Sequence, residues 1–238
     1  MDDISQPLVS VVLPTYNGEE YVAQSIKSVL SQTYQYWEFL ISDDASKDDT
    51  QAILKSYSYD PRLKLFFNQI NSGGIFSNLN SLLEKAQGHY IMVLCQDDYL
   101  DKKALSICVS LLEKYHDSKL LFTLNRTVDS EGNSFNFPAS NIRFFSEINK
   151  DLAELTPTES LLSFLKYGSI GGSLTGYFFD RDILLKVGYF KDDWKYAADW
   201  EWSYRVTTTG KILVSKTKLV NIRIHRNQVS NDLKVTKN

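Results

Sequence analysis

Cysteine and long apolar stretches are scarce in this chain of 238 residues. Its two cysteines, Cys95 and Cys108, both lie in apolar surroundings, so we expect buried free thiols and a reducing compartment. The strongest apolar runs, 8–13 and 90–95, are far shorter than the roughly 20 residues of a membrane-spanning helix. Residues 1–3 are acidic, whereas a secretory signal begins with basic residues. The sequence therefore predicts a cytoplasmic protein without a transmembrane segment, and peripheral contact with the inner face of a membrane stays open.

The chain also lacks a strong charge of either sign. Its 26 Lys and Arg residues nearly balance 29 Asp and Glu residues, which leaves a net charge of −3. Nucleic-acid-binding domains usually carry a basic excess, so we expect no nucleic acid partner. Hydrophobic residues make up 43% of the chain, which is enough for a folded core. The sequence contains no internal repeat and no low-complexity linker, and therefore predicts one domain over residues 1–238.

A glycine-rich phosphate loop is absent as well. The turn after the first apolar run, residues 14–18, contains a single glycine, Gly18. Rossmann dehydrogenases need a G-x-G-x-x-G turn at this place, and sugar nucleotidyltransferases usually begin with a Gly-rich loop. This absence argues against both classes, although a sugar nucleotidyltransferase stays an alternative.

Segments with the patterns of strands and helices alternate along the first half of the chain. Such alternation predicts βαβ units, and hence an α/β fold with a mostly parallel central sheet flanked by helices. The predicted strands span 8–13, 37–42, 62–68, 89–95 and 119–128, and the predicted helices span 22–30, 48–57, 74–86 and 100–115.

The second half is less regular, and we expect a mixed arrangement there. Thr156 and Pro157 have the residue types of a helix cap and a first helical position. The predictions are a turn at 129–133, a loop at 138–156, helices at 157–167, 180–187 and 199–208, and strands at 174–179, 211–215 and 218–224.

Polar clusters follow three of the predicted strands, at residues 14–17, 43–44 and 96–98. In open α/β sheets, ligands bind outside the carboxyl ends of the strands. The three clusters are therefore expected to meet at one edge of the sheet, where they form a ligand site.

Asp97 and Asp98 are the central feature of this edge. Mg²⁺ typically binds one or two carboxylates together with substrate phosphates, so the pair suits a divalent ion. The pair also suits the start of the helix predicted after it, where an acidic residue caps the backbone. The two residues alone leave both interpretations open.

Asp43 and Asp44 form a second acidic pair, directly after a strand. A carboxylate there can accept the N3–H of uracil or thymine, and the ring of Tyr16 can stack on a base. Helix capping is the alternative, but Asp48 and Asp49 stand closer to the predicted helix and suit that role better.

Together these motifs resemble the family 2 glycosyltransferases, which have the GT-A fold and invert the anomeric centre. The resemblance keeps its order and spacing over roughly the first hundred residues. It is looser around 187–190, 197–202 and 223–225. The matching segments of the first half are residues 9–17, 28–33, 38–46, 71–74, 86–91 and 96–98.

The resemblance implies roles for seven residues. The resemblance implies that residues 1–128 form the nucleotide-sugar-binding half. Residues 129–238 would then form the half that binds the acceptor and supplies the catalytic base. The implied nucleotide-binding residues are Pro14, Tyr16, Asp44 and Asp97; the implied metal ligands are Asp98 and His225; and the implied catalytic base is Asp199.

The same resemblance implies a metal-dependent transfer in a single displacement. Asp199 would take the proton of an acceptor hydroxyl, with Glu201 as its competitor and a helix cap as the alternative role. Mn²⁺ or Mg²⁺, with His225 and Arg223, would hold the departing diphosphate. The expected donor is a nucleoside diphosphate sugar, with a UDP-sugar favoured. The expected acceptor is a glycan or a lipid-linked sugar, as in polysaccharide biosynthesis.

Three positions depart from the family pattern. Gln96 stands where many relatives have the first Asp of an Asp-x-Asp triplet, Ala198 where Glu is frequent, and Leu79 where Arg is frequent. Gln96 weakens the argument for a metal and keeps a non-catalytic nucleotide-sugar-binding module as an alternative. An aromatic cluster, Trp194, Tyr196, Trp200 and Trp202, surrounds the predicted base and suits either sugar rings or the core.

Overall fold

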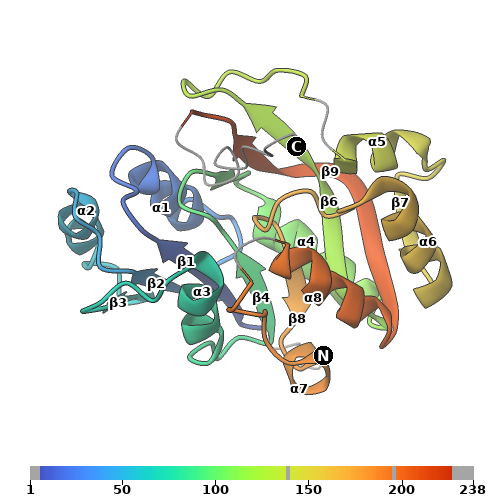
Figure 1. The fold of residues 1–238 in the computed structure, drawn as a ribbon, viewed down its shortest axis with the longest axis horizontal. Helices are drawn as coiled ribbons and strands as arrows, with labels where there is room; N and C mark the ends of the chain where they lie inside the picture. The colour runs from blue at the N-terminus through green and yellow to red at the C-terminus, as the bar shows by residue number, and fades with distance from the viewer. Residues whose placement is uncertain (1–5, 138–139, 195–196, 227–238) are drawn as a thin grey trace, which may run out of the picture.

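A single mixed sheet of nine strands forms the centre of the computed structural model, which describes residues 6–137, 140–194 and 197–226. The strand order is β3-β2-β1-β4-β8-β6-β9-β5, and β7 pairs with β9. Helices cover both faces of the sheet, since α1 and α4 belong to one hydrophobic core and α3 and α8 to the other. In Figure 1, α1 and α2 lie beside the N-terminal strands on the left, and α5 and α6 lie at the right. This architecture confirms the predicted α/β fold with a flanked central sheet.

The sheet separates two hydrophobic cores because its side chains alternate between faces. In β1, Val11 and Leu13 pack with α1 and α4 on one face, while Val12 packs with α3 on the other. The buried face of α8 joins the second core through Trp202.

The N-terminal half, residues 6–128, begins with four parallel strands, as predicted. Thr15 pairs with Asp43 and Val12 with Val93, so the carboxyl ends of three strands lie next to each other. The strands are β1 (Val9–Thr15), β2 (Trp37–Asp43), β3 (Leu63–Phe67) and β4 (Tyr90–Val93), and the connecting helices are α1 (Val22–Leu30), α2 (Thr50–Ser56) and α3 (Ile75–Leu83).

The next long strand of the chain after β4, which is β6, does not lie beside β4 in the sheet. β8 (Phe178–Asp180) lies between β4 and β6 (Ser118–Val128) and is antiparallel to both. β6 is therefore parallel to β4, and the two strands have their carboxyl ends at the same edge of the sheet. The helix predicted from residue 100 begins later, at α4 (Ala104–Lys114), because β5 (Tyr99–Leu100) pairs with β9.

The loop predicted over residues 138–156 is wrong. The segment holds α5 (Ser140–Glu147) and β7 (Leu152–Leu155). The helix is anchored by Phe144 and Phe145, which are neighbours in sequence and so do not show helical spacing. β7 is an edge strand whose main chain pairs with β9, a contact that its partly exposed side chains do not reveal.

The remaining predictions of the C-terminal half, residues 129–226, hold in outline, except that the strand predicted at 174–179 is confined to β8. α6 (Pro157–Tyr167) begins with a capping box between Thr156 and Glu159. β9 (Lys211–Arg223) is continuous where two strands were predicted, because Lys216 to Lys218 form an irregularity against β6 and not a break. The short α7 (Ile183–Val187) and α8 (Ala198–Thr207) complete the fold. Within the described ranges, no helix combines the length and apolar character needed to cross a membrane.

Candidate active site

A cavity of about 480 Å³ lies at the carboxyl ends of the parallel strands. All four residues predicted to bind the nucleotide, Pro14, Tyr16, Asp44 and Asp97, line it. The remaining wall comes from Thr15, from the loop and helix between residues 71 and 78, from Cys95 and Gln96, and from residues 192–194. Segments that are far apart in the chain therefore enclose one space at the edge where the sequence places a ligand.

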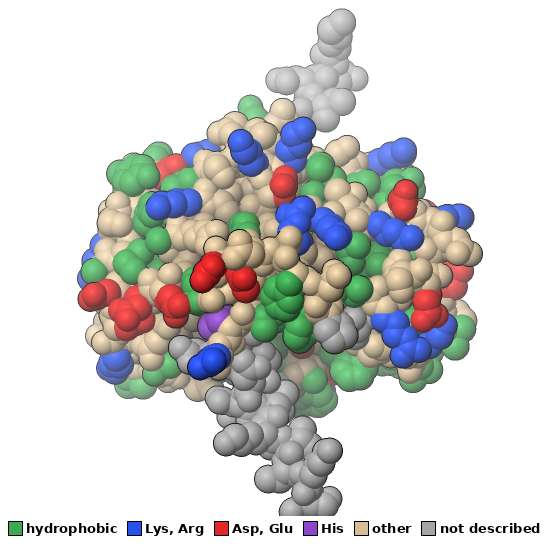
Figure 2. Space-filling view, turned by 90° about the horizontal axis from the view of Figure 1, so that it is seen from above, with side chains coloured by type: hydrophobic (Ala, Val, Ile, Leu, Met, Phe, Trp, Pro, Cys, Tyr) green, Lys and Arg blue, Asp and Glu red, His purple; other side chains and the backbone are tan. Residues whose placement is uncertain are grey.

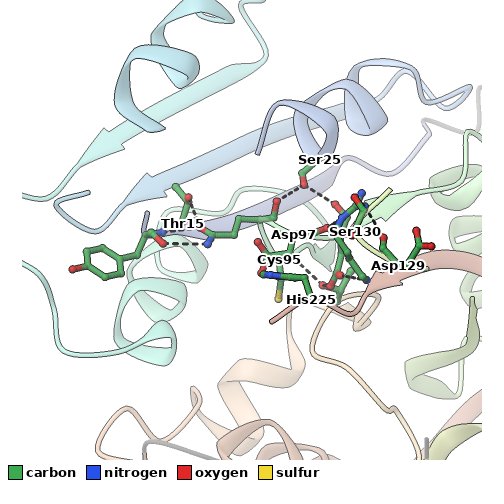
Figure 3. A network of polar contacts seen from close by, with 12 residues as sticks. Thr15, Ser25, Cys95, Asp97, Asp129, Ser130 and His225 are labelled. Carbon is green, nitrogen blue, oxygen red and sulfur yellow. Dashed lines mark hydrogen bonds and ion pairs between the residues drawn. The ribbon is translucent and has the colours of Figure 1, made fainter. Parts of the chain in front are cut away.

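The backbone of Tyr16 is held by the side chain of Gln96. Gln96 Oε1 accepts from Tyr16 N at 2.8 Å and from Thr15 Oγ1 at 2.6 Å, and its Nε2 donates to Tyr16 O at 3.1 Å (Figure 3). A Cβ atom on Gly18 would lie 2.5 Å from Gln96 Oε1, so only glycine leaves room for this contact. An aspartate at position 96 would have no N–H for Tyr16 O. The Gln96 amide therefore supports the Tyr16 backbone in a way that the acid found in many relatives could not.

Asp44 is buried and accepts three hydrogen bonds from the chain. Its Oδ1 accepts from Asn68 Nδ2 and from Ser72 N, each at 2.8 Å, and its Oδ2 accepts from Ser72 Oγ at 2.9 Å. A carboxylate offers about four acceptor positions, so one remains for a donor in the cavity. Asp43 differs, because it accepts from Ser46 and Gln51 and is absent from the cavity wall.

Left-handed backbone conformations flank the cavity. Asn17, Ala45 and Ala197 have φ values of 48°, 62° and 62°, and they are the non-glycine residues with positive φ in the described ranges. Asn17 and Ala45 directly follow the predicted site residues Tyr16 and Asp44, and Ala197 stands two residues before Asp199. Such conformations cost about 1–3 kcal/mol each and collect at functional sites.

Asp97 lines the cavity and pairs with His225, which is not one of the wall residues (Figure 3). Asp97 Oδ2 lies 3.4 Å from His225 Nε2, and the His225 ring lies 5.0 Å from the ring of Tyr21. Burial raises the pKa of Asp97, although His225 and Arg223 act in the opposite direction. The structure therefore brings together one carboxylate and one imidazole that the sequence placed in the site.

Asp98 lies behind this pair and is absent from the cavity wall. Its Oδ2 accepts from Thr175 Oγ1 at 2.5 Å, and its Oδ1 accepts from Arg223 N at 2.8 Å. Burial raises the pKa of Asp98 to about 7. Asp98 thus ties the end of β4 to β9 and to the segment before β8.

Arg223 is buried beneath Asp97. Its guanidinium donates to the carbonyl oxygens of Asp97, Asp129 and Ser130 at 2.8–3.0 Å and to Gln24 Oε1. It also lies over the ring of Tyr21, at 4.4 Å from the centroid. These contacts give Arg223 a role in fixing the backbone around Asp97, and it is absent from the cavity wall.

Asp199 lies in the first turn of α8. The N-cap of this helix is Ala197, so the capping alternative for Asp199 does not apply. Burial raises the pKa of Asp199, and its charge in turn helps to raise the pKa of Cys95, a thiol of the cavity wall. Its competitor Glu201 accepts from Arg205 Nε at 2.8 Å and from Nη2 at 2.9 Å, which occupies that carboxylate in an ion pair.

The aromatic cluster divides in the structure. Trp194 lines the cavity, whereas Trp202 is fully buried and donates from Nε1 to Gly188 O. Trp200 is exposed and absent from the wall, and Tyr196 lies outside the described residues. Sequence reasoning gave no role to Asp192 and Asp193, because an acidic pair in an irregular segment has no periodicity to reveal it.

Sequence comparison identifies the family. The model for glycosyl transferase family 2 matches residues 10–185. Chondroitin synthase of Escherichia coli is 37% identical over 137 residues, which are 56% of this chain and 20% of that protein. An uncharacterized protein of Sinorhizobium fredii, y4gI, is 31% identical over 198 residues, which are 82% of this chain and 20% of that protein. The chain therefore spans about a fifth of the length of these two relatives.

Solved structures share the fold. S. aureus TarS in complex with UDP-GlcNAc matches with a TM-score of 0.76 and 23% identity, over 92% of this chain and 59% of that chain. The mannosyltransferase PcManGT from Pyrobaculum calidifontis, in complex with GDP-Man and Mn²⁺, matches with a TM-score of 0.67 and 19% identity. The match covers 94% of this chain and 58% of that chain. The family assignment argues against the nucleotidyltransferase and dehydrogenase alternatives. The chain belongs to glycosyl transferase family 2.

Proposed function

We propose that this protein is an inverting glycosyltransferase that moves a sugar from a nucleoside diphosphate sugar to a hydroxyl of a glycan or lipid-linked acceptor. The observation that carries the proposal is the shared cavity of Pro14, Tyr16, Asp44 and Asp97 at the strand ends. A UDP-sugar is the favoured donor. The complexes of TarS with UDP-GlcNAc and of PcManGT with GDP-Man support a nucleotide sugar in this fold.

The base of the donor would lie between Tyr16 and Asp44. The Tyr16 ring is 46% exposed at the cavity, which leaves a face for stacking. The remaining acceptor position of Asp44 suits the N3–H of a uracil or thymine. Asp97 would contact the donor ribose or the diphosphate at the far end of the cavity.

Asp97 and His225 fit a divalent cation that is shared with the donor phosphates. The described residues contain no group of three His, Cys, Asp or Glu side chains placed to hold a metal by themselves. A carboxylate plus substrate phosphates suits Mg²⁺ or Mn²⁺, and such an ion would stabilise the charge of a leaving diphosphate. The sequence-based assignment of Asp98 as a ligand stays a prediction. The geometry favours Asp97, which lines the cavity, over Asp98, which does not and already accepts from Thr175. His225 is also outside the wall and is included because its Nε2 lies 3.4 Å from Asp97 Oδ2.

Asp199 would act as the general base. It would take the proton of the acceptor hydroxyl while the new bond to the anomeric carbon forms and the bond to the diphosphate oxygen breaks. Its raised pKa suits this role, because a stronger base accepts the proton more readily near neutral pH. A displacement in one step inverts the anomeric centre.

A screen of nucleotide sugars tests the proposal. Thermal shift with UDP-, dTDP- and GDP-sugars, each with and without Mn²⁺, should show stabilisation by one donor class that depends on the metal. Hydrolysis or transfer of that donor is then measured. Absence of stabilisation by every donor would overturn the proposal, and tight binding without turnover would indicate a binding module.

A further inference from the structure

A second cavity, of about 290 Å³, lies in the other part of the sheet. None of its wall residues belongs to the wall of the first cavity. It is formed by β6, by the chain that follows the turn after β6, by α5 and by β9. Its wall consists of Leu124, Asn125, Arg126, Thr127, Ser134, Phe135, Asn136, Ile142 and Lys218.

This second cavity is connected to the candidate active site through two hydrogen bonds. Arg126 Nη1 donates to Asn221 Oδ1 at 2.8 Å, and Asn221 Nδ2 donates to Tyr99 O at 3.3 Å. Tyr99 follows Asp98 directly in the chain. Because β6 is parallel to β4, residues 124–127 also run toward the edge of the sheet that carries Asp97. The second cavity therefore lies on a strand whose carboxyl end is at the edge of the sheet that carries the candidate active site.

The wall of the second cavity carries positive charge without acidic compensation. It contains Arg126 and Lys218 and no carboxylate. In the part of the chain that the structure describes, no ion pair joins either residue to an Asp or Glu. On the face seen in Figure 2, Lys and Arg side chains lie beside acidic ones at several places. In a chain of net charge −3, two such cations in one hollow favour an anionic ligand.

The neutral part of the wall suits a sugar. Ser134 and Asn136 offer a hydroxyl and an amide group. The ring of Phe135 is 42% exposed and is supported by Phe137, at 6.2 Å between centroids. An exposed aromatic face beside an amide and cations combines an apolar platform with donors for hydroxyl and anionic groups.

We propose that this second cavity binds an anionic sugar unit of the acceptor glycan, through a carboxylate or a phosphate held by Arg126 and Lys218. The proposal rests on the proposed function, because it assumes a glycan acceptor. It adds a substrate class, an acceptor glycan with regularly spaced negative charges. One anionic unit of this acceptor would bind in the second cavity, at a distance from the hydroxyl that reacts.

Calorimetric titration of the whole protein at low ionic strength tests the proposal. The probes are a hyaluronan tetrasaccharide, which carries glucuronate carboxylates, its carboxyl methyl ester, and a short poly(glycerol phosphate). Lys218→Gln removes one cation, and Arg126→Gln removes the other while leaving an amide N–H for Asn221. Lys216→Gln is the matched control, since it removes a nearby charge that does not line the cavity. UDP titration with Mn²⁺ on each variant checks the fold and the first cavity.

The proposal predicts that the wild type binds an anionic probe and binds the methyl ester at least tenfold more weakly. Lys218→Gln should lower the affinity for the anionic probe by about threefold, as for an exposed ion pair. Arg126→Gln should lower it by about tenfold, as for a charge-assisted pair. A preference for the carboxylate or for the phosphate identifies the source of the anion and supports the proposal in either case. Equal binding of acid and ester, or equal losses with Lys216→Gln, would overturn it.

The two proposals fail separately. If the wild type does not bind UDP, the proposed function fails, and the result for the anionic probes is unaffected. If neither substitution weakens binding of the anionic probe while UDP still binds, only the proposal for the second cavity fails. Where Arg126→Gln does not fold, Lys218→Gln carries the test, because Lys218 is exposed.

Discussion

The two halves of the molecule build the candidate active site in different ways. In the N-terminal half, each site residue follows the end of its own strand, and the parallel register brings Tyr16, Asp44 and Asp97 together. In the C-terminal half, Asp199 and His225 come from separate elements, and the end of β9 is held by Asp98 of the first half. The comparison indicates that the first half forms its part of the site locally, whereas the second half depends on contacts across the domain.

The largest effect is expected in the C-terminal half, from Asp199→Asn. Removal of a general base should lower kcat by about a thousandfold, since such groups contribute factors of 10² to 10⁴. UDP affinity should stay unchanged, because Asp199 is absent from the wall that holds the nucleotide-binding residues. Steady-state kinetics and UDP titration measure the two effects.

Glu201→Gln is the matched control for this substitution. Its carboxylate is paired with Arg205, so its loss should lower stability while the rate persists. In the wild type, kcat/KM should fall as the pH drops through the pKa of Asp199, because only the ionised form accepts a proton. Burial raises this pKa, so the acid limb should lie above the ordinary range of an Asp, and Glu201→Gln should retain it. A similar loss of rate in both variants would contradict the assignment.

A somewhat smaller effect is expected from Asp97→Asn, in the N-terminal half, where Asp97 contacts His225 of the C-terminal half. We expect a loss of about a hundredfold in metal-dependent rate, which corresponds to about 2.7 kcal/mol of transition-state stabilisation. Asp98→Asn should retain most of the Mn²⁺ dependence, because an amide can still bond Thr175 and Arg223 N. Mn²⁺ titrations of UDP binding and turnover compare the two. The reverse order of losses would make Asp98 the metal ligand, as the sequence suggested.

The dependence of the second half on the first can be broken at Thr175. Its Oγ1 donates to Asp98 Oδ2 and accepts from Cys95 N at 2.9 Å. Thr175→Val leaves both buried partners unsatisfied and should lower the free energy of unfolding by about 2 kcal/mol. Thr175→Ser keeps the hydroxyl and should cost clearly less. Urea unfolding measures both variants, and a larger loss in Thr175→Ser than in Thr175→Val would mean that packing of the methyl group, not the hydrogen bonds, supports this junction.

The smallest effect is expected within the N-terminal half, from Gln96→Ala. The substitution frees the backbone of Tyr16 and should weaken UDP binding by about fivefold, the equivalent of about 1 kcal/mol for a lost hydrogen-bonded support. Gln96→Glu keeps the acceptor for Tyr16 N and loses only the donor to Tyr16 O, so its effect should be smaller. Calorimetric UDP titration compares them. Unchanged affinity in Gln96→Ala would show that the local strand-end geometry holds Tyr16 without this amide.

Much of the first half was predictable because its signals are local. Amphipathic spacing gave the helices within a few residues, and the polar clusters after three strands led to Tyr16, Asp44 and Asp97. The choice between Asp97 and Asp98 was not predictable, because β4 ends at Val93 and the path of the following chain decides which side chain faces the cavity.

The second half carried fewer local signals. The place of β8 between β4 and β6 depends on main-chain pairing of segments far apart in sequence. α5 is anchored by adjacent phenylalanines without helical spacing, and β7 pairs through its backbone. The second cavity has the same origin, since Arg126 and Lys218 meet only through the pairing of β6 with β9.

The most direct test of the account is a crystal structure of the protein with UDP and Mn²⁺, with anomalous data to locate the metal. The account predicts the uracil between Tyr16 and Asp44, and an anomalous peak beside Asp97 and His225 at an ordinary metal–ligand distance of about 2.2 Å. A nucleotide bound outside this cavity, or a metal that contacts neither Asp97 nor His225, would contradict it.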